Sequence, residues 1–284
     1  MIDLNDNSRE YIDLHVHSNA SDGTYSPKEV VEYAESKGLY AFALTDHDTV
    51  DGIEEAIETA RTKIVKVIPG IEISADFGGS DLHILGLNVD YTSEGFVKIV
   101  DECRRSRDER NRKMIEKIRE HGMPLTEEIM LERFGNASVT RAHFARYMMD
   151  EGYVSSKEEA FNRYLNPGKP CYVSRERISP EMAIRLILEA GGHPVLAHPL
   201  LYKMGHDRLY STINYLKTLG LQGIEGIYSL NTPSDDQKME KIVREYGLFL
   251  TGGSDFHGSN KPAIDLGTGK GNLRISKELL KNIV

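Results

Sequence analysis

Short apolar runs alternate with longer amphipathic stretches along most of the chain. A short run rich in β-branched or aromatic residues is typical of a buried strand, whereas apolar residues three or four apart are typical of a helix. The runs that we expect to form strands are Tyr11–His15, Tyr40–Thr45, Val65–Ile73, Leu82–Val89, Pro194–His198, Gly223–Tyr228 and Leu248–Gly252. Their alternation with helical stretches predicts an α/β fold with a mainly parallel sheet or barrel.

Helix start signals lie between these strands. The run SPKE at residues 26–29 combines an N-cap serine, a proline at the first helical position and a glutamate at the third. Ser179 before Pro180 repeats the serine–proline pairing, and the run SDDQ at residues 234–237 indicates a further capping box with Ser234 as the cap. We therefore expect a helix to begin at each of these points.

The regular pattern is interrupted once, between Met123 and Ile178. This stretch has no strand-like alternation but carries two helix caps, Thr140 and Ser156. We expect residues 123–178 to form a small helical insertion and residues 1–122 and 179–284 to form a barrel. The insertion holds several basic side chains, which are Arg133, Arg141, His143, Arg146, Arg163 and Lys169.

The composition is typical of a globular protein, and 284 residues suffice for one α/β barrel with an insertion. The net charge of −9 disfavours a surface for duplex nucleic acid or anionic membranes, so an anionic substrate must be attracted locally. The two cysteines, Cys103 and Cys171, are far apart, and the first ten residues lack a signal-peptide pattern. No stretch approaches the length of a membrane span, so we expect a cytoplasmic protein.

The run YIDLHVHSNASD at residues 11–22 contains unusual polar residues in a strand. Since side chains alternate along a strand, His15 and His17 share the face opposite Leu14 and Val16, and Asp22 follows in the loop. Asp255 and His257, after the last expected strand, form a second pair of the same spacing. Burying such groups without a shared partner would cost several kcal/mol, which a metal ion removes.

Further candidate ligands lie at other strand ends. They are His47 after the second expected strand, Glu72 in the third, His83 in the fourth and His198 after the fifth. Parallel barrels gather functional groups at the C-terminal ends of their strands, so residues distant in sequence can share one pocket. Asp46 and Asp48 flank His47 and are candidates for orienting the ligands.

The motifs HVHS, TDHD, GIEIS, LAHP and SDFH, in this order, resemble the polymerase-and-histidinol-phosphatase (PHP) superfamily. The resemblance covers nearly the whole chain. Within the insertion, SVTRAHFARYMMDEG and AFNRYLNPGKPCYV are similar to one subgroup, the bacterial phosphoesterases that act on nucleoside 3′,5′-bisphosphates and on the 5′ ends of short RNAs.

This resemblance implies a distorted (β/α)7 barrel with three divalent metal ions at its C-terminal face and the insertion covering the active site. The implied ligands of the first ion are His15, His17, Glu72 and Asp255, with Glu72 bridging to the second. The second ion is bound by Glu72, His83 and His198, and the third by Asp22, His47 and His257. Some family members have a histidine where this chain has Asp22. Mixed imidazole and carboxylate ligation suits Mn²⁺, Fe²⁺ or Zn²⁺.

Three carboxylates neutralise only half the charge of three divalent ions, so the pocket is expected to attract anions. A hydroxide bridging two metals would attack phosphorus in line, and we assign Glu72, His198 and Asp255 to this catalytic centre. The proton donor for the leaving group is not identified. His143 has no role as a ligand and is a further candidate catalytic residue.

Two arginines are candidates for binding substrate phosphate. Arg141 is expected to clamp a second phosphate, since a guanidinium binds phosphate oxygens with two parallel hydrogen bonds. Arg107 lies in the run RRSRDERNRK at residues 104–113, which would otherwise be a solvated helix face. We prefer the solvated interpretation for Arg104 and Arg110, and leave Arg107 open.

The sequence therefore predicts a metal-dependent phosphoesterase. We expect it to remove the 3′-phosphate of nucleoside 3′,5′-bisphosphates and to release 5′ nucleotides from short RNA, with neither membranes nor duplex nucleic acid as stable partners. One alternative is a histidinol phosphatase, which shares the metal scaffold. The other is a non-catalytic structural domain of the kind attached to DNA polymerases.

Overall fold

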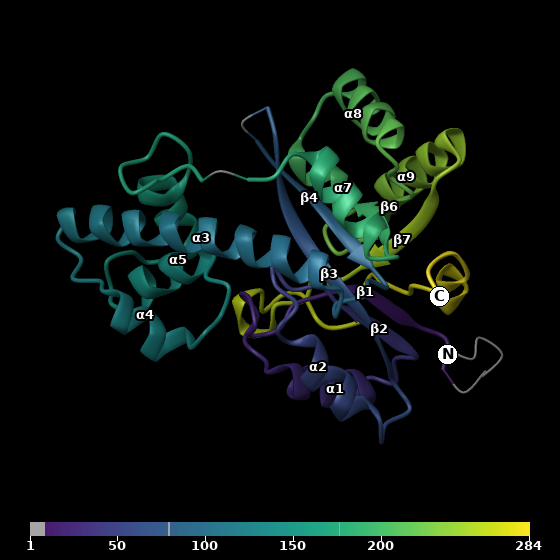
Figure 1. Cartoon of the computed structure of the whole chain (residues 1–284), viewed down its shortest axis with the longest axis horizontal. Coiled ribbons are helices and arrows are strands. Elements are labelled where there is room, and N and C mark those ends of the chain that lie inside the picture. Colours follow the sequence, from purple (N-terminus) through teal and green to yellow (C-terminus); the bar gives the residue numbers. More distant parts are fainter. Residues whose placement is uncertain (1–8, 79, 176) are drawn as a thin grey trace.

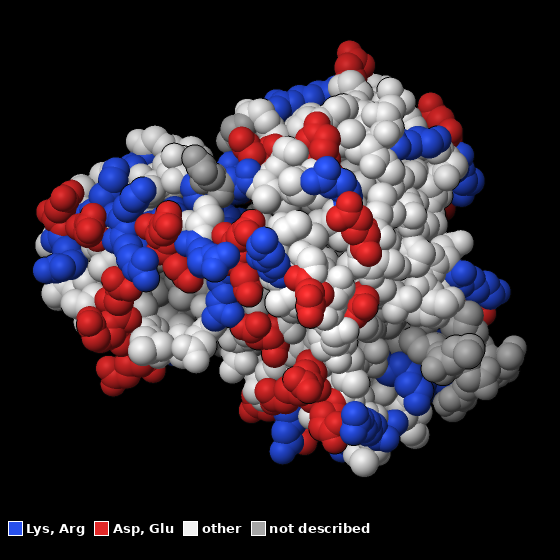
Figure 2. Space-filling model, viewed as in Figure 1, with Lys and Arg blue, Asp and Glu red and all other residues white. Residues whose placement is uncertain are grey.

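The computed structural model describes residues 9–284 except residues 79 and 176. The first eight residues, part of the stretch that we expect not to be a signal peptide, lie outside this range. The strands and most helices form a barrel, from which a group of helices extends to one side (Figure 1). Figure 2 shows acidic and basic residues interspersed over the same face, without a region of one sign.

The barrel is a seven-stranded sheet whose strands are ordered as in the sequence. The strands are β1 (Ile12–Val16), β2 (Ala41–Leu44), β3 (Lys66–Phe77), β4 (Ser80–Leu87), β5 (His193–Leu196), β6 (Gly223–Tyr228) and β7 (Phe249–Gly253). The segment after β7 nearly closes the barrel onto β1, since the Asp255 N–H donates to the His15 carbonyl at 2.8 Å and the His17 N–H donates to the Phe256 carbonyl at 3.0 Å. The expected barrel architecture is confirmed.

One strand departs from the parallel arrangement. β4 pairs antiparallel with both β3 and β5, whereas the other neighbours pair in parallel. The reason is the connection: β3 continues to Phe77 and β4 begins at Ser80. A turn this short joins only antiparallel strands, because a parallel pair needs a crossover of a dozen or more residues.

Six of the described helices belong to the barrel: α1 (Pro27–Ser36), α2 (Ile53–Ala60), α3 (Glu94–Glu120), α7 (Pro180–Glu189), α8 (His206–Thr218) and α9 (Pro233–Tyr246). Ser26 forms the expected capping box of α1 with Glu29, and Ser179 caps α7. The expectation for Ser234 is wrong, because α9 is capped by Thr232, whose partner is Asp235. Pro233 occupies the first helical position, and a residue before proline favours the extended conformation of a cap.

The remaining helices follow α3. They are α4 (Glu127–Phe134), α5 (Arg141–Asp150), α6 (Lys157–Ala160) and the π-helical turn η1 (Phe161–Leu165). Thr140 caps α5 and Ser156 caps α6, as expected. These helices share an apolar core with the C-terminal part of α3, while Phe96 and Val100 near its N-terminus pack into the barrel core. The helix α3 thus packs into both apolar cores and joins the two parts. No helix in the described part of the chain is long and apolar enough to cross a membrane.

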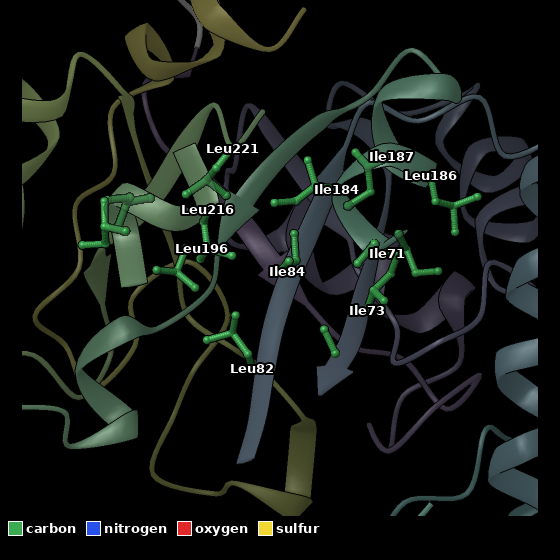
Figure 3. Close-up of a cluster of buried hydrophobic side chains, with 14 of the residues drawn as sticks. Ile71, Ile73, Leu82, Ile84, Ile184, Leu186, Ile187, Leu196, Leu216 and Leu221 are labelled. Atoms are coloured by element: carbon green, nitrogen blue, oxygen red, sulfur yellow. The ribbon is translucent and has the colours of Figure 1, made fainter. Parts of the chain in front are cut away.

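The largest apolar cluster lies between the sheet and its covering helices. Figure 3 shows Ile71, Ile73 and Ile84 of the hairpin facing Ile184 and Ile187 of α7. Because side chains alternate along a strand, the intervening positions face the other way. These positions include Glu72 and His83, so the same packing that buries the isoleucines turns both polar groups toward the barrel interior.

Candidate active site

The nine side chains expected to bind metal come together at one end of the barrel. Their ligand atoms form four overlapping groups, and within each group the atoms lie within 4.8 Å of one another. The groups are His17–Asp22–His47–His257, His15–Glu72–His198, His15–His17–Asp255 and His47–Glu72–His83. They link residues that are more than 240 positions apart in the sequence.

Glu72 lies at the centre of this cluster. Its Oε2 atom lies 3.2 Å from a ring nitrogen of each of three histidines, His15, His17 and His47. Its Oε1 atom lies 2.7 Å from His83 Nδ1 and 3.1 Å from His198 Nε2. A carboxylate that faces histidines with both oxygens has the position required of a bridging ligand.

The other two carboxylates extend the cluster on either side of His257. Asp22 Oδ1 lies 3.1 Å from His257 Nε2 and 3.9 Å from nitrogens of His17 and His47. Asp255 Oδ1 lies 3.3 Å from His257 Nδ1 and 3.5 Å from His17 Nε2. Oδ1 of each carboxylate therefore faces ring nitrogens of the histidine cluster.

Several of these buried atoms have no hydrogen-bond partner among the described residues. They are His15 Nε2, His17 Nε2, Asp22 Oδ1, His47 Nδ1 and His198 Nδ1. Burying a polar atom without a partner is costly, so partnerless side chains gathered in these ligand groups fit bound cations. The residues present are thus suited to divalent metal ions.

The protonation states of two ligands, His47 and Glu72, agree with metal binding; for His15 and His83, burial lowers the pKa but nearby carboxylates, Glu225 and Glu72 for His15 and Glu72 for His83, raise it above its usual value. Burial lowers the pKa of His47 to about 3, so its imidazole is neutral. Burial by itself would raise the pKa of Glu72, but the surrounding histidines His47, His83 and His15 hold it well below its usual value. Neutral imidazoles and ionised carboxylates are the forms that bind metal.

A residue that the sequence reasoning missed orients two of the ligands. Glu225, buried in β6, accepts hydrogen bonds from His15 Nδ1 at 2.9 Å and from the His198 backbone N–H at 2.8 Å. Because Nδ1 of His15 is hydrogen-bonded to Glu225, the other ring nitrogen, Nε2, is directed toward the cluster. The signal was present in the run GIEGIY, where a single carboxylate interrupts an apolar strand.

Asp46 and Asp48, expected to orient ligands, have different partners. Asp46 accepts hydrogen bonds from Ser18 and Ser21 and thereby shapes the loop that carries Asp22. Asp48 forms ion pairs with Arg107 and with Arg175. Neither carboxylate contacts an imidazole directly.

The backbone at the site is strained. Asp48, His198 and Asp255 have φ angles of 51°, 29° and 57°, a region that residues other than glycine seldom occupy. Gly253 lies so close to β1 that an added Cβ would lie 2.3 Å from that of His15. Such strain persists where the surrounding structure holds ligands in place, and it is typical of functional sites.

A cavity of about 180 Å³ borders the cluster. Asp22, His47 and His83 form its barrel side, and Thr140, Phe161 and Tyr172 of the insertion face them. Five arginines also line it: Arg107, Arg110, Arg141, Arg175 and Arg177. The structure thus brings both arginines expected to bind phosphate, Arg107 and Arg141, to the candidate metal site.

These arginines have few acidic partners. Arg107 and Arg175 share the carboxylate of Asp48, and Arg141, at 3.0 Å, shares that of Asp81 with Arg177. Arg177 also pairs with Asp76 at 3.4 Å. Arg175 and Arg177 were missed by the sequence reasoning, although two arginines two residues apart, just before the return to the barrel, were a usable signal.

Arg110 is the most unusual member of the group. The interpretation as a solvated residue is wrong, because Arg110 is only 6% exposed, and its Nε and one terminal nitrogen have no hydrogen-bond partner among the described residues. Burial, together with the charges of Arg107, Arg175 and Arg141, lowers its pKa well below its usual value. Arg104, by contrast, lies on the outer side and pairs with Asp51.

His143 lies apart from this cavity. It is buried beside Phe134, and its Nδ1 accepts a 2.9 Å hydrogen bond from the Thr140 N–H. It lines a second cavity of about 500 Å³, together with Arg146 and Asn260. Its assignment as a catalytic residue stays a prediction.

Known proteins are similar to this chain in sequence and in fold. A 5′-3′ exoribonuclease of Haemophilus influenzae is 37% identical over 86% of this chain and 89% of its own length. A 3′,5′-nucleoside bisphosphate phosphatase of Chromobacterium violaceum is 35% identical over 90% of both chains. A solved structure from Chromobacterium violaceum, described as an amidohydrolase with bound sulfate, superposes with a TM-score of 0.86 at 33% identity, covering 96% of this chain and 97% of that one.

A family model settles the classification. The PHP domain model matches residues 13–166, more than half of the chain and the part that contains the first six candidate ligands. The resemblance seen in the motifs is confirmed, and with it the expected class of enzyme. The chain belongs to the PHP family of metal-dependent phosphoesterases.

Proposed function

We propose that this chain removes the 3′-phosphate from nucleoside 3′,5′-bisphosphates and releases 5′ nucleotides from short RNA. The observation that carries this proposal is that five arginines line the cavity bordering a ligand cluster for divalent ions, and that the described residues pair four of these arginines with three carboxylates, Asp48, Asp76 and Asp81. A substrate with one phosphate at the metal ions and another at the arginines would satisfy both.

The five arginines outnumber the carboxylates that are paired with them. The buried guanidinium of Arg110 feels the like charges of Arg107, Arg175 and Arg141 and the opposite charge of Asp81, and two of its nitrogens have no hydrogen-bond partner among the described residues. An anion in the cavity would supply both the charge and the hydrogen-bond acceptors, and phosphate matches the planar donor pairs of arginine. Because the chain has a net charge of −9, attraction of an anionic substrate depends on this local group and on bound metal ions.

The nine side chains would hold up to three divalent ions, with Mn²⁺, Fe²⁺ and Zn²⁺ as the candidates. When bound, the ions would activate a water for attack on phosphorus and neutralise charge developing on the phosphate oxygens. Glu72 would hold two ions at a set separation, since its two oxygens face different histidines. Arg141 and Arg107 would position the second phosphate from the insertion and from α3.

The relatives support this substrate class. Two of them are named for action on nucleoside bisphosphates and on RNA ends, and the similarity extends over most of each chain. A histidinol phosphatase is less compatible with the cavity, since histidinol phosphate carries one phosphate and a cationic amine that five arginines would repel. A purely structural domain would have no need for all nine ligand positions.

The test is a phosphate-release panel with the purified protein and added Mn²⁺, Fe²⁺ or Zn²⁺. The substrates are adenosine 3′,5′-bisphosphate, AMP, histidinol phosphate and a short RNA. We expect the bisphosphate to be hydrolysed with the highest kcat/KM and a chelator to abolish turnover. Faster hydrolysis of histidinol phosphate, or turnover of none of the substrates with any metal, would overturn the proposal.

A further inference from the structure

The arginine cavity also has an apolar part, which the insertion supplies. Phe161, the first residue of η1, and Tyr172 line it together with Val173. The guanidinium carbon of Arg141 lies 5.9 Å from the centroid of each aromatic ring. Both rings therefore lie near Arg141, in the cavity that borders the metal-ligand cluster.

The backbone on either side of these rings is anchored. Leu165 and Cys171 are fully buried in the core of the helical part, and the Cys171 N–H donates to the Tyr164 carbonyl at 3.0 Å. The Tyr172 N–H donates to the Lys169 carbonyl at 3.0 Å. Both rings remain only half-buried, so each keeps surface that the protein does not cover.

The cavity is thus amphipathic. One part is cationic and hydrogen-bonding, and the other presents flat apolar surface. A sugar phosphate alone would leave the rings in contact with water. In a nucleotide, one sugar separates the phosphates from a planar base. Bases stack on aromatic side chains and on guanidinium planes.

We infer that Phe161 and Tyr172 form the site that binds the nucleobase of the substrate, and that they make the enzyme select nucleotides over sugar phosphates. This inference rests on the proposed function, because it assigns a role within the same cavity. Stacking accepts every base, so the site discriminates the presence of a base rather than its identity.

The experiment compares adenosine 3′,5′-bisphosphate with its base-free analogue, in which hydrogen replaces the base on the same sugar bisphosphate. For the unmodified enzyme we expect kcat/KM to be on the order of ten- to a hundredfold higher with the base present. Equal rates on both substrates would overturn the inference without touching the proposed function. Turnover of neither would instead contradict the proposed function.

Variants then test whether the preference for the nucleotide depends on Phe161 and Tyr172. Phe161→Leu and Tyr172→Leu should each lower kcat/KM for the nucleotide by about tenfold and leave the base-free substrate nearly unchanged. Tyr164→Leu is the matched control, because Tyr164 also lies on η1 but contacts His121 and Arg163 rather than the cavity. If both cavity variants kept the full preference for the nucleotide, the base would bind elsewhere.

Discussion

The hydroxyl of Thr140 donates a 2.9 Å hydrogen bond to Oδ2 of Asp22, and this contact joins the helical insertion to the candidate metal centre. Thr140 is also the N-cap of α5, since its oxygen accepts from the Ala142 N–H at 3.1 Å. With Oδ2 held from the insertion, Oδ1 of Asp22 is left to face His257. A residue outside the barrel thus determines how one ligand of the cluster points.

Removing this hydroxyl should weaken the proposed metal site at Asp22, His47 and His257. We expect Thr140→Val to lower the number of metal ions that survive dialysis, because Asp22 would lose the contact that orients it. Thr126→Val is the control, since Thr126 caps α4 in the same way but has no link to the cluster. Both variants should lose about 1 kcal/mol of stability from the cap. Equal metal contents in the two variants would contradict the role of Thr140.

Glu225 should matter for metal affinity although it is not itself a candidate ligand. Glu225→Leu would free Nδ1 of His15 and leave the His198 N–H without its acceptor. We expect divalent-ion affinity to fall by about 10- to 100-fold in a competition titration against a chelator. Glu225→Gln keeps an acceptor oxygen and should lose much less. Similar losses in both variants would indicate a general packing role.

Arg110 should lower the unfolding free energy of the protein and at the same time contribute to anion binding. Arg110→Leu removes a buried charge that is surrounded by other cations, so we expect unfolding free energy to rise by about 1 kcal/mol or more. The same variant should gain less stability from added inorganic phosphate than the unmodified protein. Thermal melts with and without phosphate measure both effects. A variant that is less stable but equally stabilised by phosphate would show that Arg110 is only structural.

Arg141 should act selectively on substrates with two phosphates. Arg141→Ala removes a guanidinium from the cavity, and we expect kcat/KM for adenosine 3′,5′-bisphosphate to fall by on the order of a hundredfold, with a much smaller loss on AMP. Arg146→Ala, on the same helix but lining the other cavity, is the control. Equal losses on both substrates would place Arg141 elsewhere in the mechanism.

The pair of Arg9 and Glu35 should make stability depend on acidic pH. Hydrogen bonds from Arg9, at 2.8 and 3.0 Å, lower the pKa of Glu35 from its usual 4.5 to about 2. A lowered pKa means that the contribution is complete above pH 4.5 and is lost as pH falls toward 2. Urea unfolding across this range should show the difference between the unmodified protein and Glu35→Gln shrinking with acidity. A constant difference would show that the pair does not titrate as expected.

Local sequence patterns determined much of this protein. The apolar runs were long enough to specify strands, and the period of 2 assigned His15 and His17 to one face before any partner was known. Ser26 and Ser179 marked helix starts, because capping depends only on neighbouring residues. Thr232 was missed because the capping pattern at Ser234 lies two residues later, whereas the helix begins at Pro233, directly after Thr232.

The tertiary structure decided which polar groups meet and which are buried. Arg104 and Arg110 lie on one helix in one charged run, yet only Arg110 is buried in the cavity, because the insertion folds back over that face of α3. Glu225, Arg175 and Thr140 likewise acquire their roles only through residues far away in the sequence. Strand periodicity and caps follow from interactions within a few residues, whereas charge burial depends on packing between distant segments, which no local pattern encodes.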